Sequence, residues 1–114
     1  LIPQSEIPFA IDAHPFRDAD GQWYLFYARD FLEAEENGYR SGTGLAVRKM
    51  ASMTELEPED HIVLRARHEW QRFQKDRRMS EYDNRVFDWH TLEGAFIVPH
   101  DERYYCFYSA AAYH

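Results

Sequence analysis

The chain of 114 residues is short of several residue types, and each shortage excludes a class of protein. Cys106 is its one cysteine, so neither an internal disulfide nor a cysteine-based metal site can form. No apolar run approaches the roughly 20 residues that a membrane-spanning helix needs. The 13 Lys and Arg are outnumbered by 20 Asp and Glu and form no basic block, which argues against a surface that follows nucleic-acid phosphates. We therefore expect neither a membrane nor a nucleic acid as partner.

Motifs for metals, cofactors and nucleophiles are also missing. The six histidines are not spaced like the ligands of an H-E-x-x-H motif. Gly42-x-Gly44 lacks the strand–turn–helix setting of a phosphate-binding loop, and Ser109 lacks the flanking glycines of a nucleophile elbow. Arg77-Arg78 is interpreted as a solvated surface feature. The sequence predicts no metal and no cofactor.

Aromatic residues are abundant, at 17% of the chain, and they follow turn signals. Asp20-Gly21 is a strong tight-turn dipeptide, and the aromatic run 22–27 comes directly after it. This pattern predicts a hairpin with strands over 11–17 and 22–29. Further β-prone runs cover 43–50, 61–66, 86–89, 92–99 and 103–109. Residues 67–85 are charged and lack a periodic apolar face, so a long loop is expected there.

Comparing the sequence with itself at an offset of 81 residues reveals a repeat. Asp12 falls on Glu93, Phe16 falls on Ile97, and the aromatic residues at 23–27 fall on those at 104–108. A chance match between two aromatic patches is the alternative, but it leaves the shared carboxylate position unexplained. Four short strands per unit are the content of one β-propeller blade. We expect an all-β fold, a partial propeller of about one and a half blades, spanning 1–114 as a single domain. Within it, 9–66 forms a blade-like unit, 67–85 the loop, and 86–114 the start of the next blade.

The two repeated carboxylates, Asp12 and Glu93, invite a chemical interpretation. The first strand of each propeller blade lines the central channel, so both side chains are expected to face one pocket. Two carboxyl groups across a sugar-sized gap are the working parts of glycoside hydrolysis. The structural alternative is that each acid caps a turn or pairs with an arginine. The sequence leaves both interpretations open.

The motifs of the two repeat units resemble those of glycoside hydrolase family 43. The first unit resembles the second-blade signature of that family through Ile11-Asp12, Phe16, Asp18, Asp20-Gly21 and Tyr24-Leu25-Phe26-Tyr27. The second unit is similar to its third-blade signature through Trp89-His90-Thr91-Leu92-Glu93-Gly94 and Arg103-Tyr104-Tyr105-Cys106-Phe107-Tyr108-Ser109. The resemblance implies a five-bladed propeller that hydrolyses arabinose- or xylose-containing glycans with inversion, as an α-L-arabinofuranosidase or β-xylosidase does.

The resemblance also implies roles for single residues. Glu93 matches the general acid of the family, and Asp12 matches the aspartate that raises the pKa of the acid. The family has proline where this chain has Ala95, and glycines where it has residues 110–112. The general base of the family lies on its first blade, and no residue of this chain matches it. The chain alone is then either an incomplete enzyme or a non-catalytic carbohydrate-binding or self-assembling module.

Four further residues near the two carboxylates are candidates for substrate binding. Trp89 is either a platform on which a sugar stacks or a packing residue. His14 and His90 either bond sugar hydroxyls or pack, and Phe16 lies close to Asp12 in sequence. We expect a pentose-containing glycan as ligand. Because one and a half blades leave a sheet edge and an apolar face uncovered, we also expect a homo-oligomer or association with missing blades.

Overall fold

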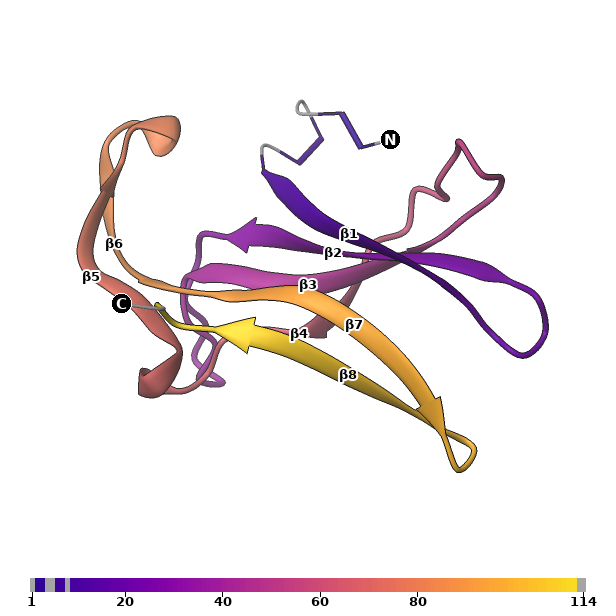
Figure 1. The fold of residues 1–114 in the computed structure, drawn as a ribbon. Coiled ribbons are helices and arrows are strands. Elements are labelled where there is room, and N and C mark those ends of the chain that lie inside the picture. Colours follow the sequence, from indigo (N-terminus) through magenta and orange to yellow (C-terminus); the bar gives the residue numbers. More distant parts are fainter. Residues whose placement is uncertain (1, 4–5, 8, 113–114) are drawn as a thin grey trace.

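The computed structural model describes residues 2–3, 6–7 and 9–112, and this part of the chain is all-β. Eight strands and two single turns of 3₁₀-helix follow one another, with no α-helix among the described residues (Figure 1). Accordingly, no described helix is long and apolar enough to cross a membrane. The elements in chain order are β1 (Ala10–Arg17), β2 (Trp23–Phe31), β3 (Gly42–Lys49), β4 (His61–Leu64), η1 (Glu69–Gln71), β5 (Arg72–Met79), η2 (Ser80–Tyr82), β6 (Arg85–His90), β7 (Leu92–His100) and β8 (Arg103–Ala110).

The first four strands form an antiparallel sheet in the order β1-β2-β3-β4. The predicted hairpin at Asp20-Gly21 is confirmed, with Gly21 at a φ of 84°. Asp18 closes the turn, since its carboxylate accepts hydrogen bonds from the backbone N–H groups of Asp20 and Gln22. Local turn chemistry thus places the first two strands, as the sequence indicates.

The prediction of a long loop over 67–85 is wrong. Residues 72–79 form β5, which pairs with β6, so the predicted strand 86–89 closes a hairpin with β5. Two register shifts interrupt the β5–β6 ladder, between Arg72 and Gln74 and between Gln74 and Arg77. Each such bulge breaks the alternation of buried and exposed side chains on which strand prediction depends. This is why a strand with mostly charged residues has the sequence pattern of a loop.

A close backbone approach attaches the β5–β6 hairpin to the first sheet. Gly42 at the start of β3 pairs in parallel with His90 at the end of β6. A Cβ added to Gly42 would lie 1.9 Å from the carbonyl oxygen of His90, so only glycine allows this contact. The result is one curled, mixed sheet of six strands in place of a separate four-stranded blade, which is where the structure departs from the expected propeller geometry.

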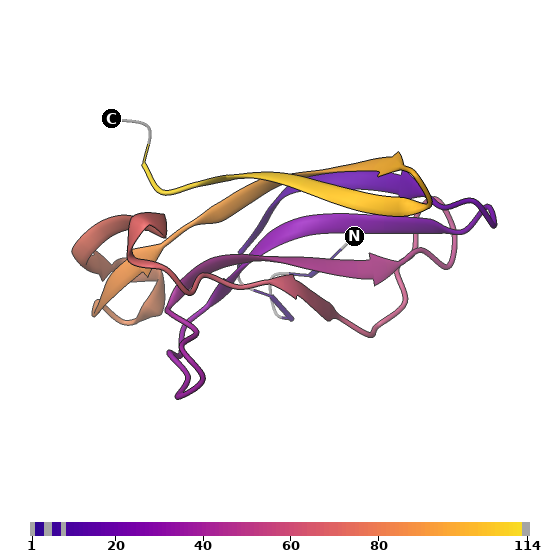
Figure 2. The ribbon, with the colours of Figure 1, turned by 90° about the horizontal axis from the view of Figure 1, so that it is seen from below.

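The β7–β8 hairpin forms a second layer that packs on β1, β2 and β3 (Figure 2). The core between the layers consists of small and aliphatic residues: Ala28, Leu45, Ala66, Leu92 and Ala95. Leu45 and Leu92 have no exposed surface. Cys106 packs against this core, and burial raises the pKa of its thiol.

The sequence repeat corresponds to two hairpins of the same construction. Hairpin β1–β2 shifts its register between Ile11 and His14, and hairpin β7–β8 shifts between Glu93 and Phe96. Each bulge holds a residue with positive φ, Asp12 at 55° and Gly94 at 67°. Bulges re-aim side chains. The repeat therefore places a carboxylate at a backbone irregularity in both hairpins.

The layer contact generates a stability prediction. Leu92→Ala removes a fully buried side chain from the core between the layers, so the free energy of unfolding should fall by about 2–5 kcal/mol in urea denaturation. Val86→Ala is the control, because Val86 is 49% exposed, and its effect should stay within about 0.5 kcal/mol. Equal effects of the two substitutions would contradict the assignment of Leu92 to the core.

Candidate active site

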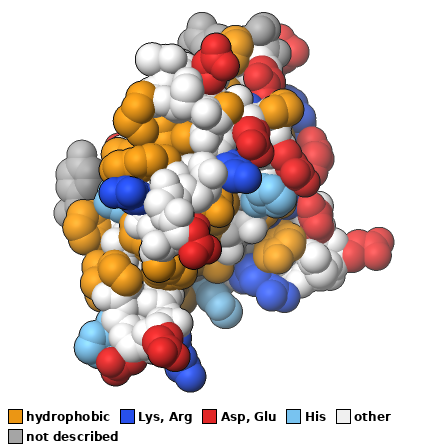
Figure 3. Space-filling model, turned by 90° about the vertical axis from the view of Figure 1, so that its right-hand side faces the viewer, with side chains coloured by type: hydrophobic (Ala, Val, Ile, Leu, Met, Phe, Trp, Pro, Cys, Tyr) orange, Lys and Arg blue, Asp and Glu red, His pale blue; other side chains and the backbone are white. Residues whose placement is uncertain are grey.

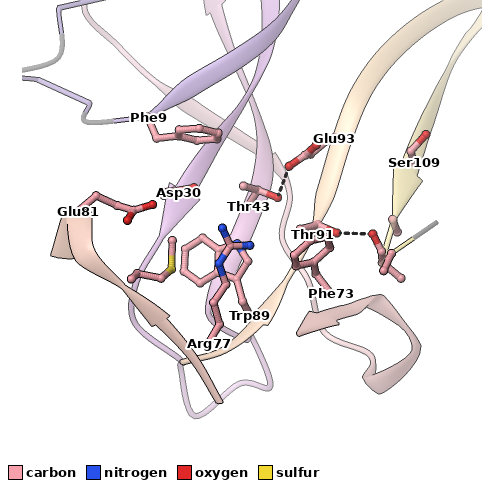
Figure 4. Close-up of a pocket in the computed structure, with 14 residues that line it drawn as sticks. Phe9, Asp30, Thr43, Phe73, Arg77, Glu81, Trp89, Thr91, Glu93 and Ser109 are labelled. Carbon is pink, nitrogen blue, oxygen red and sulfur yellow. Dashed lines mark hydrogen bonds between the residues drawn. The ribbon is translucent and has the colours of Figure 1, made fainter. Parts of the chain in front are cut away.

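A cavity of about 610 Å³ lies where the two layers and the β5–β6 hairpin meet, within the size range of ligand sites. In Figure 4, Glu93 and Thr43 stand on one side of the cavity and Asp30 and Glu81 on the other. The guanidinium of Arg77 points between them. The cavity is lined by Phe9, Asp30, Thr43, Phe73, Arg77, Met79, Glu81, Trp89, Thr91, Glu93 and residues 109–112.

Glu93 is the carboxylic acid that β7 contributes to this cavity. It follows the fully buried Leu92, and the hydroxyl of Thr43 donates a long hydrogen bond of 3.5 Å to its Oε1. The same hydroxyl accepts the backbone N–H of Leu92 at 3.1 Å, which fixes β3 against the start of β7. Burial and, secondly, the charge of Asp12 raise the pKa of Glu93, while Thr43 and Arg77 oppose the shift.

Asp12 is close enough to Glu93 for their charges to interact, but the surroundings of Asp12 differ from those of Glu93. Its side chain is exposed at the β1 bulge and lines a separate hollow with Ile11, Leu25 and Tyr27. Asp12 is not among the residues that line the cavity around Glu93. The structure therefore brings the two carboxylates near enough to interact through charge. That both face one pocket stays a prediction.

Trp89 and the side chains around it build the wall of the cavity on the β5–β6 side. Its side chain is 3% exposed, and its ring packs edge-on against Phe87 at 5.5 Å between centroids. Trp89, Phe87 and Met79 together form a buried hydrophobic cluster. Trp89 is thus a packing residue that also lines the cavity, and its role as a platform on which a sugar stacks stays a prediction.

Asp30 is a cavity residue that the sequence analysis missed. It pairs across the strands with Thr43, and the hydroxyl of Tyr82 donates a hydrogen bond to its carboxylate. Its other oxygen, Oδ1, is buried without a partner among the described residues. Burial raises the pKa of Asp30 to about 6, and the charges of Glu81 and then Glu93 add to the shift, while Tyr82 and Arg77 oppose it. Asp30 lies outside the repeated positions, so no sequence pattern points to it.

The structure places His14, Phe16 and His90 away from the cavity. His14 accepts the backbone N–H of Ile97 at 3.2 Å and packs on Phe96. Phe16 lies in an apolar groove between the layers, edge-on to Tyr104. His90 is buried, and its Nδ1 lies 3.0 Å from the carbonyl oxygen of Asp88. The geometry gives these three side chains packing roles, and a role in sugar binding stays a prediction for them.

Comparison with known proteins adds one finding to this geometry. No family model and no curated protein matches the chain. A crystal structure of a thermostable family-43 glycoside hydrolase matches 91% of the chain, with a TM-score of 0.64 and 30% sequence identity. The chain is built like part of a family-43 glycoside hydrolase.

The match covers 30% of that family-43 hydrolase. The motifs that resemble family 43 in sequence thus occur in a chain that also resembles a family-43 enzyme in structure. Among the described residues, no group of three or more His, Cys, Asp or Glu is arranged to hold a metal ion. The side chains that line the cavity carry carboxyl groups, hydroxyl groups, one guanidinium and aromatic rings.

The effect of Asp12 on Glu93 can be measured directly. Asp12→Asn removes a negative charge that raises the pKa of Glu93, so this pKa should fall toward its ordinary value. Titration of the Glu93 side-chain carboxyl by carbon-13 NMR measures the shift. Asp20→Asn, at the exposed turn of the β1–β2 hairpin, is the matched control and should leave the Glu93 pKa unchanged. An unchanged or higher pKa in the Asp12 variant would exclude its modulating role.

Proposed function

We propose that this chain is the part of an inverting glycoside hydrolase that carries the general acid, acting on arabinose- or xylose-containing glycans. The observation that supports this most is Glu93, a half-buried acid with a raised pKa in a cavity of sugar size. The structural likeness to a family-43 glycoside hydrolase supports the reaction class. The pentose specificity comes from the sequence resemblance alone.

In this proposal Glu93 protonates the glycosidic oxygen as the bond to the leaving group breaks. Its raised pKa keeps the proton on the carboxyl at a pH nearer to neutral, where the proton is available for transfer. Asp12 contributes the negative charge that favours the protonated form, and Thr43 holds Oε1 in place. A second carboxylate, which no described residue is assigned to supply, activates water. In inverting enzymes this base stands roughly 6.5–9.5 Å from the acid.

The same proposal assigns the strands to propeller blades. Strands β1–β4 have the antiparallel order of one blade, and β7–β8 begin the next blade and pack against its face. The β5–β6 hairpin is then an insertion between the two blades, which lengthens the repeat and contributes Trp89 and Arg77 to the cavity.

The function is tested by Glu93→Gln on the purified chain. Good leaving groups need no proton, so hydrolysis of 4-nitrophenyl arabinofuranoside or xyloside should be lost less than hydrolysis of arabino- and xylo-oligosaccharides. The loss on oligosaccharides should be about 10²–10⁴-fold, the contribution of one general acid. Equal losses on both substrate types would count against Glu93 as the acid. Binding of oligosaccharides by calorimetry without any hydrolysis would instead support the non-catalytic alternative.

Self-assembly is a second candidate role, favoured by the outer face of the β7–β8 hairpin. Phe96 is 56% and Phe107 is 62% exposed there, and Tyr105 is also exposed. β8 pairs only with β7 among the described strands, so its other edge is open. Figure 3 views the end that carries the β1–β2 and β7–β8 turns, and hydrophobic side chains gather mainly on its left-hand side, while many of the acidic ones lie along the right.

This candidate predicts that the chain associates with itself. Light scattering at micromolar concentration should give a mass above the 13.7 kDa of one chain. Phe107→Lys places a charge on the exposed face and should shift the mass toward that of the monomer. A sharply melting species of 13.7 kDa for the unmodified chain would refute self-assembly.

A further inference from the structure

Arg77 is presented to the cavity by an irregularity in β5. The β5–β6 ladder shifts register between Gln74 and Arg77, and Asp76 within this bulge has a φ of 49°. The carboxylate of Asp88 accepts the backbone N–H of Asp76 at 3.0 Å and so fixes the bulge. Because a bulge re-aims the following side chain, Arg77 enters the cavity, whereas Arg78 binds the carbonyl oxygen of Asn84.

The guanidinium of Arg77 has unused hydrogen-bond donors. It stacks over Phe73 at 5.2 Å from the ring centroid. Among the described residues it makes no hydrogen bond and no ion pair, although a guanidinium carries five N–H donors. In Figure 4 it points between Asp30 and Glu93, which are the acceptors on the two sides of the cavity. The N–H donors of Arg77 and the carboxylate acceptors therefore point into the same part of the cavity.

The charge balance of the cavity selects the chemical class of ligand. Asp30, Glu81 and Glu93 line it together with Arg77 as the one Lys or Arg among the lining residues. A carboxylate ligand would meet more acidic than basic groups. A neutral, polyhydroxylated ligand can accept hydrogen bonds from Arg77 and donate them to the carboxylates, with an aromatic wall alongside.

We propose that Arg77 is a sugar-binding residue, whose guanidinium donates hydrogen bonds to hydroxyl oxygens of a neutral glycan in the cavity beside Glu93. This inference rests on the carbohydrate function proposed above and adds a residue that belongs to neither repeat unit. The β5–β6 hairpin is then the element that recognises the sugar, and Glu93 on β7 is the element that acts on it.

The rival explanation is that Arg77 serves only as a counter-charge, because it lowers the pKa of Glu93. Lysine separates the two roles, since it keeps the charge and lacks the planar fork of donors. The experiment compares Arg77→Lys, Arg77→Gln and the neighbouring control Arg78→Gln. Calorimetry with xylo- and arabino-oligosaccharides measures affinity, and carbon-13 NMR measures the pKa of Glu93.

Both Arg77 variants should weaken oligosaccharide binding about tenfold, the effect of losing a charged hydrogen bond, and Arg78→Gln should not. The pKa of Glu93 should rise in Arg77→Gln and stay near that of the unmodified chain in Arg77→Lys. If Arg77→Lys binds as tightly as the unmodified chain, Arg77 is a counter-charge and the inference fails while the proposed function stands. If the unmodified chain binds neither glycan, both fail.

Two further measurements complete the test. Should Arg77→Gln not fold, the Nε–H resonance of Arg77 in the unmodified chain reports contact directly, and it should shift on titration with the oligosaccharide. An unmoved resonance at saturating sugar would overturn the inference. A glucuronic-acid-substituted xylo-oligosaccharide should bind more weakly than its neutral counterpart, and tighter binding would refute the neutral class of ligand.

Discussion

The packing of the β7–β8 hairpin on the first sheet is the contact on which the candidate site depends. Leu92 is fully buried in this contact, and Glu93 is the next residue along the chain. The hydroxyl of Thr43 accepts the N–H of Leu92 and donates to Glu93, so one side chain ties the core to the acid. The burial that stabilises the two layers also removes the Glu93 carboxyl from water, and this desolvation is the main cause of its raised pKa. The stability of the two layers and the raised pKa of Glu93 therefore have a common origin in this chain.

The electrostatics of the cavity depend on which charged side chains the fold brings close together. The charge of Asp12 on β1 raises the pKa of Glu93, and the charge of Glu93 in turn raises the pKa of Asp30 on β2. Arg77 is the opposing charge, and it comes from a hairpin that is attached to the sheet through the close approach of Gly42 to His90. The cavity thus combines an acid whose pKa is raised with a guanidinium that has unused hydrogen-bond donors. This combination fits a neutral sugar better than a charged ligand.

Sequence reasoning predicted the parts of this structure that depend on local chemistry. Turn residues placed the β1–β2 hairpin, and the repeat located Glu93 in a second hairpin of the same construction. Sequence reasoning failed where tertiary contacts, and not local chemistry, determine the secondary structure and the position of a side chain. The bulges in β5 hide its alternation, so the sequence pattern predicts a loop where a strand forms and a surface position for Arg77, which lines the cavity. Asp30 reaches the site because β2 lies beside β3 and because the hydroxyl of Tyr82 donates a hydrogen bond to the Asp30 carboxylate. No spacing in the sequence reveals either contact. His14 and His90 lie close to the carboxylates in sequence, but His14 binds the backbone N–H of Ile97, and Nδ1 of His90 lies beside the backbone carbonyl of Asp88.

We propose that the cavity between the two layers and the β5–β6 hairpin binds a glycan next to Glu93. The most direct test of this proposal is a crystal structure of the chain soaked with a xylo- or arabino-oligosaccharide. We expect a sugar ring between Glu93 and Arg77, with a glycosidic oxygen within hydrogen-bond distance of the Glu93 carboxyl. A sugar bound only elsewhere, for example in the apolar groove that Phe16 and Tyr104 line, would contradict the proposal.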